Sequence, residues 1–166
     1  MDEYICKIAP LEEMNTKWDY EIAHAGEDRD NWIIWKKSSI EHMQEGKSIP
    51  YYGILYGQVI SEATAILDGS IAQNSDGLVD GKTAYLSAFR TIPEYQGKGY
   101  FSKLFRYMLE DLKNCGYEKV TLGVEPEETE NKKIYFHYGF TEHIKNGVEV
   151  YPDGPKIDVE YYGKQL

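Results

Sequence analysis

One stretch, residues 85–102, constrains the fold of this chain more than any other. It reads YLSAFRTIPEYQGKGYFS, and its first part, Tyr85 to Thr91, is rich in aromatic and small apolar residues, as a buried strand is. Pro93 lacks a backbone donor and therefore ends the strand. The sequence predicts a strand that leaves its sheet at Pro93 and enters a glycine-containing loop, Gln96 to Gly99.

A helix of about four turns is predicted directly after this loop. Its apolar residues follow the i, i+3, i+4, i+7 spacing of one helical face; they are Phe101, Leu104, Phe105, Met108, Leu109 and Leu112. The N–H groups of the first turn have no partner within the helix, and Gly97 and Gly99 let a ligand approach that backbone closely. Lys98 adds positive charge. We therefore expect an anion at this helix start, and a phosphate in particular.

Three phosphate-binding patterns were compared with this loop. The nucleotide P-loop is absent, because no GxxxxGK followed by Ser or Thr occurs. The dinucleotide fingerprint fits poorly, since Ser102 replaces its third glycine and residues 93–96 interrupt the tight strand-to-helix turn that it needs. The third pattern is the cofactor loop of the GNAT acetyltransferase superfamily, which has Arg or Gln, two residues, Gly, one residue, then Gly or Ala. Gln96 to Phe101 resembles it, with Phe101 as a departure whose side chain must point away from the pyrophosphate.

The downstream residues extend this resemblance. Gly116 is placed to end the helix, and a second buried strand, Val120 to Val124, follows it. Another short helix, Asn131 to Tyr138, stops at Gly139. Its segment IYFHYGF resembles the closing motif of GNAT proteins, in which a tyrosine four residues before a Gly-Phe pair commonly faces the cofactor sulfur. That tyrosine is Tyr135, and the resemblance covers about residues 83 to 145 closely.

The remaining segments complete a fold of the α/β class, of α+β type. The expected elements are a strand at Tyr4 to Ile8, helices at Pro10 to His24 and Asn31 to Glu45, a hairpin of Ile49 to Leu55 and Gln58 to Leu67, a loop at Gly69 to Gly81, and a hairpin of Thr141 to Lys145 and Ile157 to Tyr162 around a YPDG turn at Tyr151 to Gly154. We predict one GNAT-like domain over residues 1–166. It should hold a mixed, mostly antiparallel sheet of about six to seven strands flanked by about four helices, with the two central strands parallel.

The resemblance also implies a cofactor site. Acetyl-CoA would be the co-substrate, with no metal, and its pantetheine would pair with backbone near Phe89 and Thr91 where the central strands splay apart. The implied cofactor-binding residues are Phe89, Thr91, Gln96, Gly97, Lys98, Gly99, Tyr100, Phe101, Ser102, Asn131 and Tyr135. Tyr135 would be the general acid that protonates the departing thiolate, because an ordinary phenol pKa of about 10 lies only slightly above that of a thiol.

The base and the acceptor site have several candidates. Glu62 falls on a half-buried face of its predicted strand and could be a general base, or simply a solvated strand residue. Glu125, just past the second central strand, is the competing carboxylate. Trp32 and Trp35 are three residues apart on a predicted helix, so they are either core anchors or, since GNAT proteins generally cover the acceptor cleft with this region, walls of the acceptor site.

Composition narrows the partners. The formal charge of -10 argues against nucleic acid and favours a cationic acceptor, although acidity also simply keeps proteins soluble. The four histidines and two cysteines, Cys6 and Cys115, have no metal-ligand spacing. The N-terminus does not resemble a signal peptide and no apolar run has the length of a membrane span, so we expect a cytoplasmic protein without a membrane partner. A homodimer is one option for its assembly.

These observations predict an acyl-CoA-dependent N-acyltransferase of the EC 2.3.1 class. The expected reaction carries acetyl from acetyl-CoA to a primary amine of a small molecule, such as a cationic antibiotic or a polyamine, by direct attack in a ternary complex. Two alternatives remain open. One is a domain that binds CoA without chemistry, as a sensor or interaction module, and the other is an acetyltransferase for a protein N-terminus or lysine.

Overall fold

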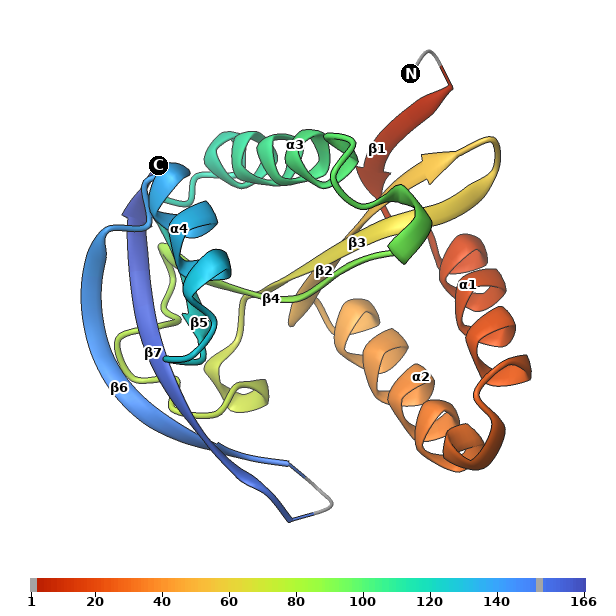
Figure 1. Cartoon of the computed structure of the whole chain (residues 1–166), viewed down its shortest axis with the longest axis horizontal. Coiled ribbons are helices and arrows are strands. Elements are labelled where there is room, and N and C mark those ends of the chain that lie inside the picture. Colours follow the sequence, from red (N-terminus) through yellow and green to blue (C-terminus); the bar gives the residue numbers. More distant parts are fainter. Residues whose placement is uncertain (1–2, 152–153) are drawn as a thin grey trace. The chain divides into compact units, whose positions relative to one another are not determined.

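A seven-stranded sheet with the order β1-β2-β3-β4-β5-β7-β6 is the framework of the protein. The computed structural model describes residues 3–151 and 154–166 (Figure 1). β4 and β5 are parallel, whereas β1 with β2, β5 with β7, and β6 with β7 are antiparallel. This confirms the predicted mixed, mostly antiparallel sheet with a parallel central pair. The elements are β1 (Tyr4–Ile8), α1 (Leu11–Ala23), α2 (Arg29–Gln44), β2 (Ser48–Leu55), β3 (Gln58–Ile66), β4 (Thr83–Thr91), α3 (Tyr100–Asn114), β5 (Lys119–Val124), α4 (Thr129–His137), β6 (Glu142–Val150) and β7 (Lys156–Gln165).

The chain divides into two compact units. The first comprises Met1–Thr64 with Ala88–Tyr107, and the second comprises Ala65–Ser87 with Met108–Leu166. The boundary passes within β4 and within α3, so both elements contribute residues to each unit. The expectation of one domain over residues 1–166 stays a prediction.

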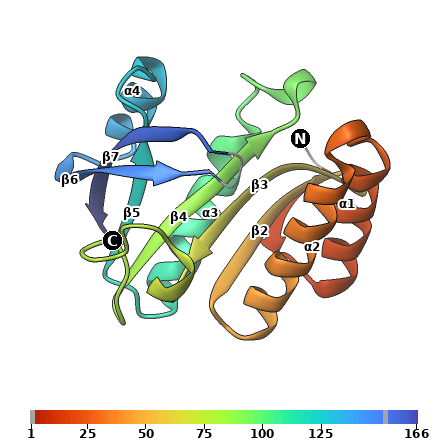
Figure 2. The same ribbon diagram turned by 90° about the horizontal axis from the view of Figure 1, so that it is seen from below.

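In the first unit, α1 and α2 lie side by side beside β2 (Figure 2). Met14 on α1 is fully buried, and it belongs to a core that joins both helices to the strands. The members of this core are Ala9, Met14, Tyr52 and Ile54, with Trp18, Ile40, Met43 and Val59 packed against them. β2 and β3 form the predicted hairpin, and their two-residue turn has positive φ at both Tyr56 (48°) and Gly57 (80°), as tight hairpin turns require.

In the second unit, β5 pairs with β4 on one side and with β7 on the other. The buried Thr121 of β5 donates a hydrogen bond to the carbonyl oxygen of Leu78 at 2.8 Å, which ties the preceding loop to the strand. Leu78 in turn packs in a core with Val159 and Tyr161 of β7. The loop expected at Gly69 to Gly81 contains a 3₁₀ helix, Gly69–Ile71, in which the Ser70 N–H donates to Asp68 Oδ1 at 2.8 Å.

The C-terminal hairpin differs from the prediction. β6 runs to Val150, whereas the sequence pattern predicted its end at Lys145, because β6 stays paired with β7 as far as Val150 opposite Lys156. Apolar and polar residues alternate only weakly after Lys145, so the sequence did not indicate the rest of this strand. A register shift between His143 and Lys145 also interrupts the two-residue alternation of its side chains. The predicted YPDG turn lies partly outside the described residues, since these omit 152 and 153.

No helix in residues 3–151 and 154–166 is both long and apolar enough to cross a membrane.

Candidate functional site

The loop between β4 and α3 has the backbone conformation that the sequence predicts. Gly97 and Gly99 have φ values of 74° and 85°, which residues other than glycine rarely adopt. α3 begins at Tyr100, immediately after Gly99, and the Gly99 carbonyl accepts the N–H of Lys103 at 3.2 Å. The exposed Lys98 extends its ammonium toward the Tyr95 ring, 6.0 Å from the centroid. The loop therefore places the start of a helix beside a flexible positive charge.

Gln96 fastens this loop to the strand before it. Its side-chain amide donates a hydrogen bond to the carbonyl oxygen of Thr91 at 3.0 Å, across the 3₁₀ helix Pro93–Tyr95. The Ser61 hydroxyl on β3 lies 3.0 Å from the Thr91 hydroxyl. The first residue of the glycine pattern is thus a positioning group for the loop.

Aromatic packing holds the first turn of α3. The Phe101 ring packs against the rings of Phe89 and Phe105, each at 5.6 Å between centroids. The Tyr4 hydroxyl donates to the Tyr100 carbonyl oxygen at 2.9 Å, and the two rings are 4.7 Å apart. Ser102 is half-buried in the same turn. The bulky Phe101, which departs from the glycine pattern, is therefore accommodated by packing against β4.

β4 has an unusual residue next to this site. Its parallel register with β5 covers Thr83 to Leu86, and Ala88 then adopts φ 56° inside the strand. A non-glycine residue in the left-handed region is uncommon, and such strain is found preferentially at functional sites. Phe89 and Thr91, the predicted partners of pantetheine, follow directly.

Glu62 on β3 is ion-paired with Lys17 on α1. Lys17 Nζ donates to Glu62 Oε1 at 3.0 Å, and the two side chains are only 6% and 19% exposed. Glu62 is therefore not a solvated strand residue. Sequence reasoning missed Lys17, because no local pattern connects two residues so far apart in the chain.

The tryptophans form one cluster with a charged pair. Trp32 lies 5.7 Å from Trp18 and 5.3 Å from Trp35, between ring centroids. The Arg90 guanidinium lies 5.8 Å from the Trp32 ring and donates to Glu21 at 2.7 Å. Trp32 is half-buried, whereas Trp35 is 42% exposed. Of the four predicted acceptor-site residues, Trp32 thus lies next to Arg90 of β4, and Trp35 packs against Trp32. The sequence did not identify Arg90 or Glu21 as neighbours of the tryptophans. The one sequence signal for the cluster was that all three tryptophans lie within residues 18–35.

In the second unit, Tyr135 occupies the last turn of α4. Gly139 ends this helix with φ 97°, and the Phe140 N–H donates to the Tyr135 carbonyl oxygen at 3.0 Å. The Gly139 N–H bonds the Phe136 carbonyl oxygen, also at 3.0 Å, which completes a Schellman helix stop. Phe140 is fully buried. The four-residue spacing between Tyr135 and Gly139 thus follows from the geometry of this helix C-terminus.

The environment of Tyr135 makes it a weak acid. Removal from water, together with the negative charge of Glu128, raises the pKa of the phenol to about 12. The hydroxyl therefore keeps its proton at neutral pH and serves as a hydrogen-bond donor.

The other candidates of the second unit lie at the surface near the start of α4. Asn131 is exposed and its amide donates to Glu128 Oε2 at 3.3 Å. Glu125 follows β5, and a hydrogen bond with Glu128 raises the pKa of its carboxyl group. In the described part of the chain, no group of three or more His, Cys, Asp or Glu side chains could hold a metal ion.

Solved structures of acetyltransferases share this fold. The ribosomal-protein-S18-alanine N-acetyltransferase from Escherichia coli has 15% identity and a TM-score of 0.69, with 98% of this chain and 94% of that chain covered. An N-acetyltransferase from Staphylococcus aureus Mu50 has 19% identity and a TM-score of 0.66, with 98% of each chain covered. A protein from Salmonella typhimurium described as an acetyltransferase, solved with acetyl-CoA, has 18% identity and a TM-score of 0.63, with 99% of this chain and 94% of that chain covered.

No curated protein sequence matches the chain significantly. The model of the acetyltransferase (GNAT) family, however, matches residues 12–140. This match contains the glycine loop, the tryptophan cluster and the closing motif, and it reaches further toward the N-terminus than the resemblance seen in the motifs alone. The chain therefore belongs to the GNAT family of acetyl-CoA-dependent N-acetyltransferases.

Proposed function

We propose that this enzyme transfers acetyl from acetyl-CoA to a primary amine of a small cationic molecule, by direct attack within a ternary complex. The observation that carries the cofactor half of the proposal is the pair of left-handed glycines, Gly97 and Gly99, ahead of α3. Backbone N–H groups at such a helix start suit a pyrophosphate, so the side chains of the loop need contribute little.

The pantetheine would continue along β4. The strained Ala88 interrupts the regular strand just before Phe89, and the backbone of Phe89 and Thr91 would pair with the pantetheine amides. The Thr91 carbonyl oxygen already accepts a hydrogen bond from Gln96, which holds the end of the strand in one place. The Thr91 N–H is the group proposed to bond the pantetheine. Asn131 on α4 is proposed as a further cofactor contact.

Direct attack is supported by the state of the two thiols. Burial raises the pKa of the Cys6 thiol, which disfavours the thiolate that a nucleophile needs. Cys115 is exposed just past the end of α3, where the helix dipole also disfavours negative charge. Acetyl found on either thiol by mass spectrometry, after incubation with acetyl-CoA alone, would contradict direct attack.

The acceptor is proposed from charge and from the tryptophan cluster. The formal charge of -10 attracts a cationic amine over an anionic one. Trp35, partly exposed beside Trp32 and Arg90, would form a wall of the acceptor site. Acetylation of a protein N-terminus is the second candidate, since a neighbour of this fold acts on ribosomal protein S18. A panel of small amines and N-terminal peptides, assayed by release of free CoA, separates the two, and absence of turnover with every amine would favour a CoA-binding module without chemistry.

Substitution of Gly99 by Glu should abolish acetyl-CoA binding. The φ of 85° disfavours any side chain, and the carboxylate would repel a pyrophosphate at the helix start. Isothermal titration calorimetry should show a loss of more than about 100-fold in affinity, whereas Lys98→Ala should cost about 1 kcal/mol or less.

Gly116→Glu is the matched control for this variant. It places the same charge at a glycine with φ 96°, but at the opposite end of α3. It should share the backbone strain and keep its affinity for acetyl-CoA. Unchanged affinity in Gly99→Glu would rule out the loop as the pyrophosphate site.

Tyr135 is proposed as the donor to the departing CoA sulfur. Its pKa of about 12 lies further above that of a thiol than an ordinary phenol does, so proton transfer is more uphill than the sequence suggested, and a hydrogen bond to the developing thiolate carries more of the effect. Tyr135→Phe should lower kcat by about 10 to 1000 fold with acetyl-CoA affinity nearly unchanged.

The pH profile provides a second measurement on Tyr135. Because the raised pKa keeps the phenol protonated from pH 6 to 9, its ionisation should cause no alkaline loss of kcat in that range. Tyr138→Phe, which removes a nearby hydroxyl, is the control and should retain kcat. Equal turnover of Tyr135→Phe and the parent at saturating acceptor would exclude Tyr135 as the donor.

Glu62 is proposed as the base, direct or through water, that deprotonates the acceptor ammonium. Lys17 contacts only Oε1, so in the proposal Oε2 receives the proton. Glu62→Gln should lower kcat/KM by about 100-fold. Lys17→Met breaks the same ion pair but keeps the carboxylate, and it should retain most of the rate.

Thermal unfolding of both variants corrects for instability, since each leaves one buried partner uncompensated. Equal losses of rate in the two variants would make the pair structural. A full rate in Glu62→Gln would move the proposed role to a water chain or to Glu125, whose raised carboxyl pKa suits a proton acceptor.

A further inference from the structure

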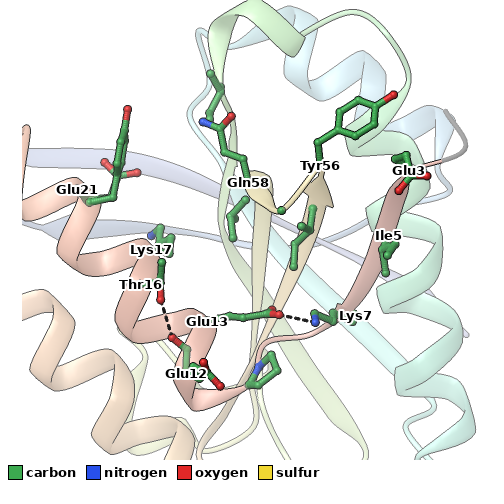
Figure 3. A pocket seen from close by; sticks show the side chains of 16 residues that line it. Glu3, Ile5, Lys7, Glu12, Glu13, Thr16, Lys17, Glu21, Tyr56 and Gln58 are labelled. Atoms are coloured by element: carbon green, nitrogen blue, oxygen red, sulfur yellow. Dashed lines mark hydrogen bonds and ion pairs between the residues drawn. The ribbon is translucent and has the colours of Figure 1, made fainter.

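A cavity lies in the first unit, between α1, β1 and the β2–β3 turn (Figure 3). Its volume of about 710 Å³ is that of a small-molecule site. Several apolar side chains line it, namely Ile5, Pro10, Ile54, Val59 and Ile92. None of Glu62, Trp32, Trp35 and the glycine loop belongs to the lining, although Lys17, which is ion-paired with Glu62, does.

The charges around this cavity are unbalanced. Four glutamates line it against two lysines; the six residues are Glu3, Glu12, Glu13, Glu21, Lys7 and Lys17. Lys17 and Glu21 are neutralised by Glu62 and Arg90, which lie outside the lining. Glu3 and Glu12 are exposed and have no ion pair within residues 3–151 and 154–166. The cavity therefore keeps an excess of negative charge.

Glu13 has an unsatisfied oxygen. Its side chain extends from α1 toward β1, where Oε1 is ion-paired with Lys7 (Figure 3). Oε2 is buried and has no hydrogen-bond partner among the described residues. A carboxylate oxygen deprived of water without a donor is unfavourable, and a turn of the Glu13 side chain toward the cavity would expose it to an N–H donor from a ligand.

The rim of the cavity carries two exposed aromatic rings. Tyr56, at the tip of the β2–β3 turn, is 78% exposed, and Tyr20 on α1 is 56% exposed. Aromatic faces attract organic cations and cover alkyl chains equally well. Apolar lining, aromatic rim and unpaired carboxylates together select a ligand that is both aliphatic and cationic.

We propose that this cavity is a binding site for an aliphatic ammonium ion, separate from the acceptor site. The alkyl chain lies on the apolar lining around Ile5 and Ile54. The ammonium donates to Glu13, with Glu12 as a second negative charge. The site does not depend on acetyl transfer, so it should be observable in the protein without acetyl-CoA.

Calorimetry with hexylammonium tests the proposal on the full chain, with hexanoate as the charge control. Hexylammonium should bind once per chain at submillimolar concentration, and hexanoate should bind at least about tenfold more weakly. Ile5→Trp should fill the cavity and weaken hexylammonium at least about tenfold. Ile5 is 56% exposed, so the chain should tolerate the ring, and Ile8→Trp on the same strand, outside the lining, is the matched control.

Charge is tested in the same titration. Glu13→Gln should also weaken hexylammonium about tenfold, whereas Glu27→Gln, an exposed carboxylate away from the lining, should not. Equal binding of hexylammonium and hexanoate would overturn the cation site. Binding that survives Ile5→Trp would place the ligand elsewhere, and absence of binding at millimolar concentration would exclude the site.

Discussion

The left-handed backbone at Gly97 and Gly99 is the constraint on which the proposed cofactor site depends. With both φ values positive, the chain leaves β4 and starts α3 at Tyr100 without a side chain in the way of a ligand. Any other residue at these positions would strain the backbone, because both φ values are positive. In the proposed function of this GNAT-family chain, the pyrophosphate binds at that helix start.

The glycine loop is held in one position because contacts from several rigid elements fix it. Gln96 ties it to the end of β4, Tyr4 on β1 bonds the Tyr100 carbonyl, and Phe101 packs on Phe89. None of these contacts needs to touch the cofactor. They keep the helix start in one position, so that little ordering is required when a ligand binds.

Strand β4 also joins the glycine loop to the proposed acceptor site in the first unit. Arg90, between Phe89 and Thr91, bonds Glu21 and lies near the Trp32 ring. Glu62 reaches α1 through the buried Lys17. The two ion pairs connect α1 to β3 and to β4, and Lys17 and Glu21 also line the cavity proposed for an ammonium ion. Lys17 therefore lines the cavity and also contacts Glu62, the proposed base.

Local patterns predicted most of the fold, including the glycine loop that leads into α3. Gly116 and Gly139 end their helices with positive φ as expected, because a helix stop is written in adjacent residues. The partners of Glu62 and Trp32 could not be predicted, since Lys17 and Arg90 meet them only after the strands and helices pack. The predicted length of β6 was wrong for the same reason. The strand extends to Val150 because it pairs with β7, and its own sequence alternation does not indicate this.

The most direct test of the account is an amide chemical-shift titration of the ¹⁵N-labelled protein with acetyl-CoA. The account predicts that the largest shifts fall on the N–H groups of residues 97–102 and of Phe89 and Thr91, while those of the 3₁₀ helix Gly69–Ile71 stay unchanged. Saturation with acetyl-CoA that leaves residues 97–102 unperturbed would contradict it.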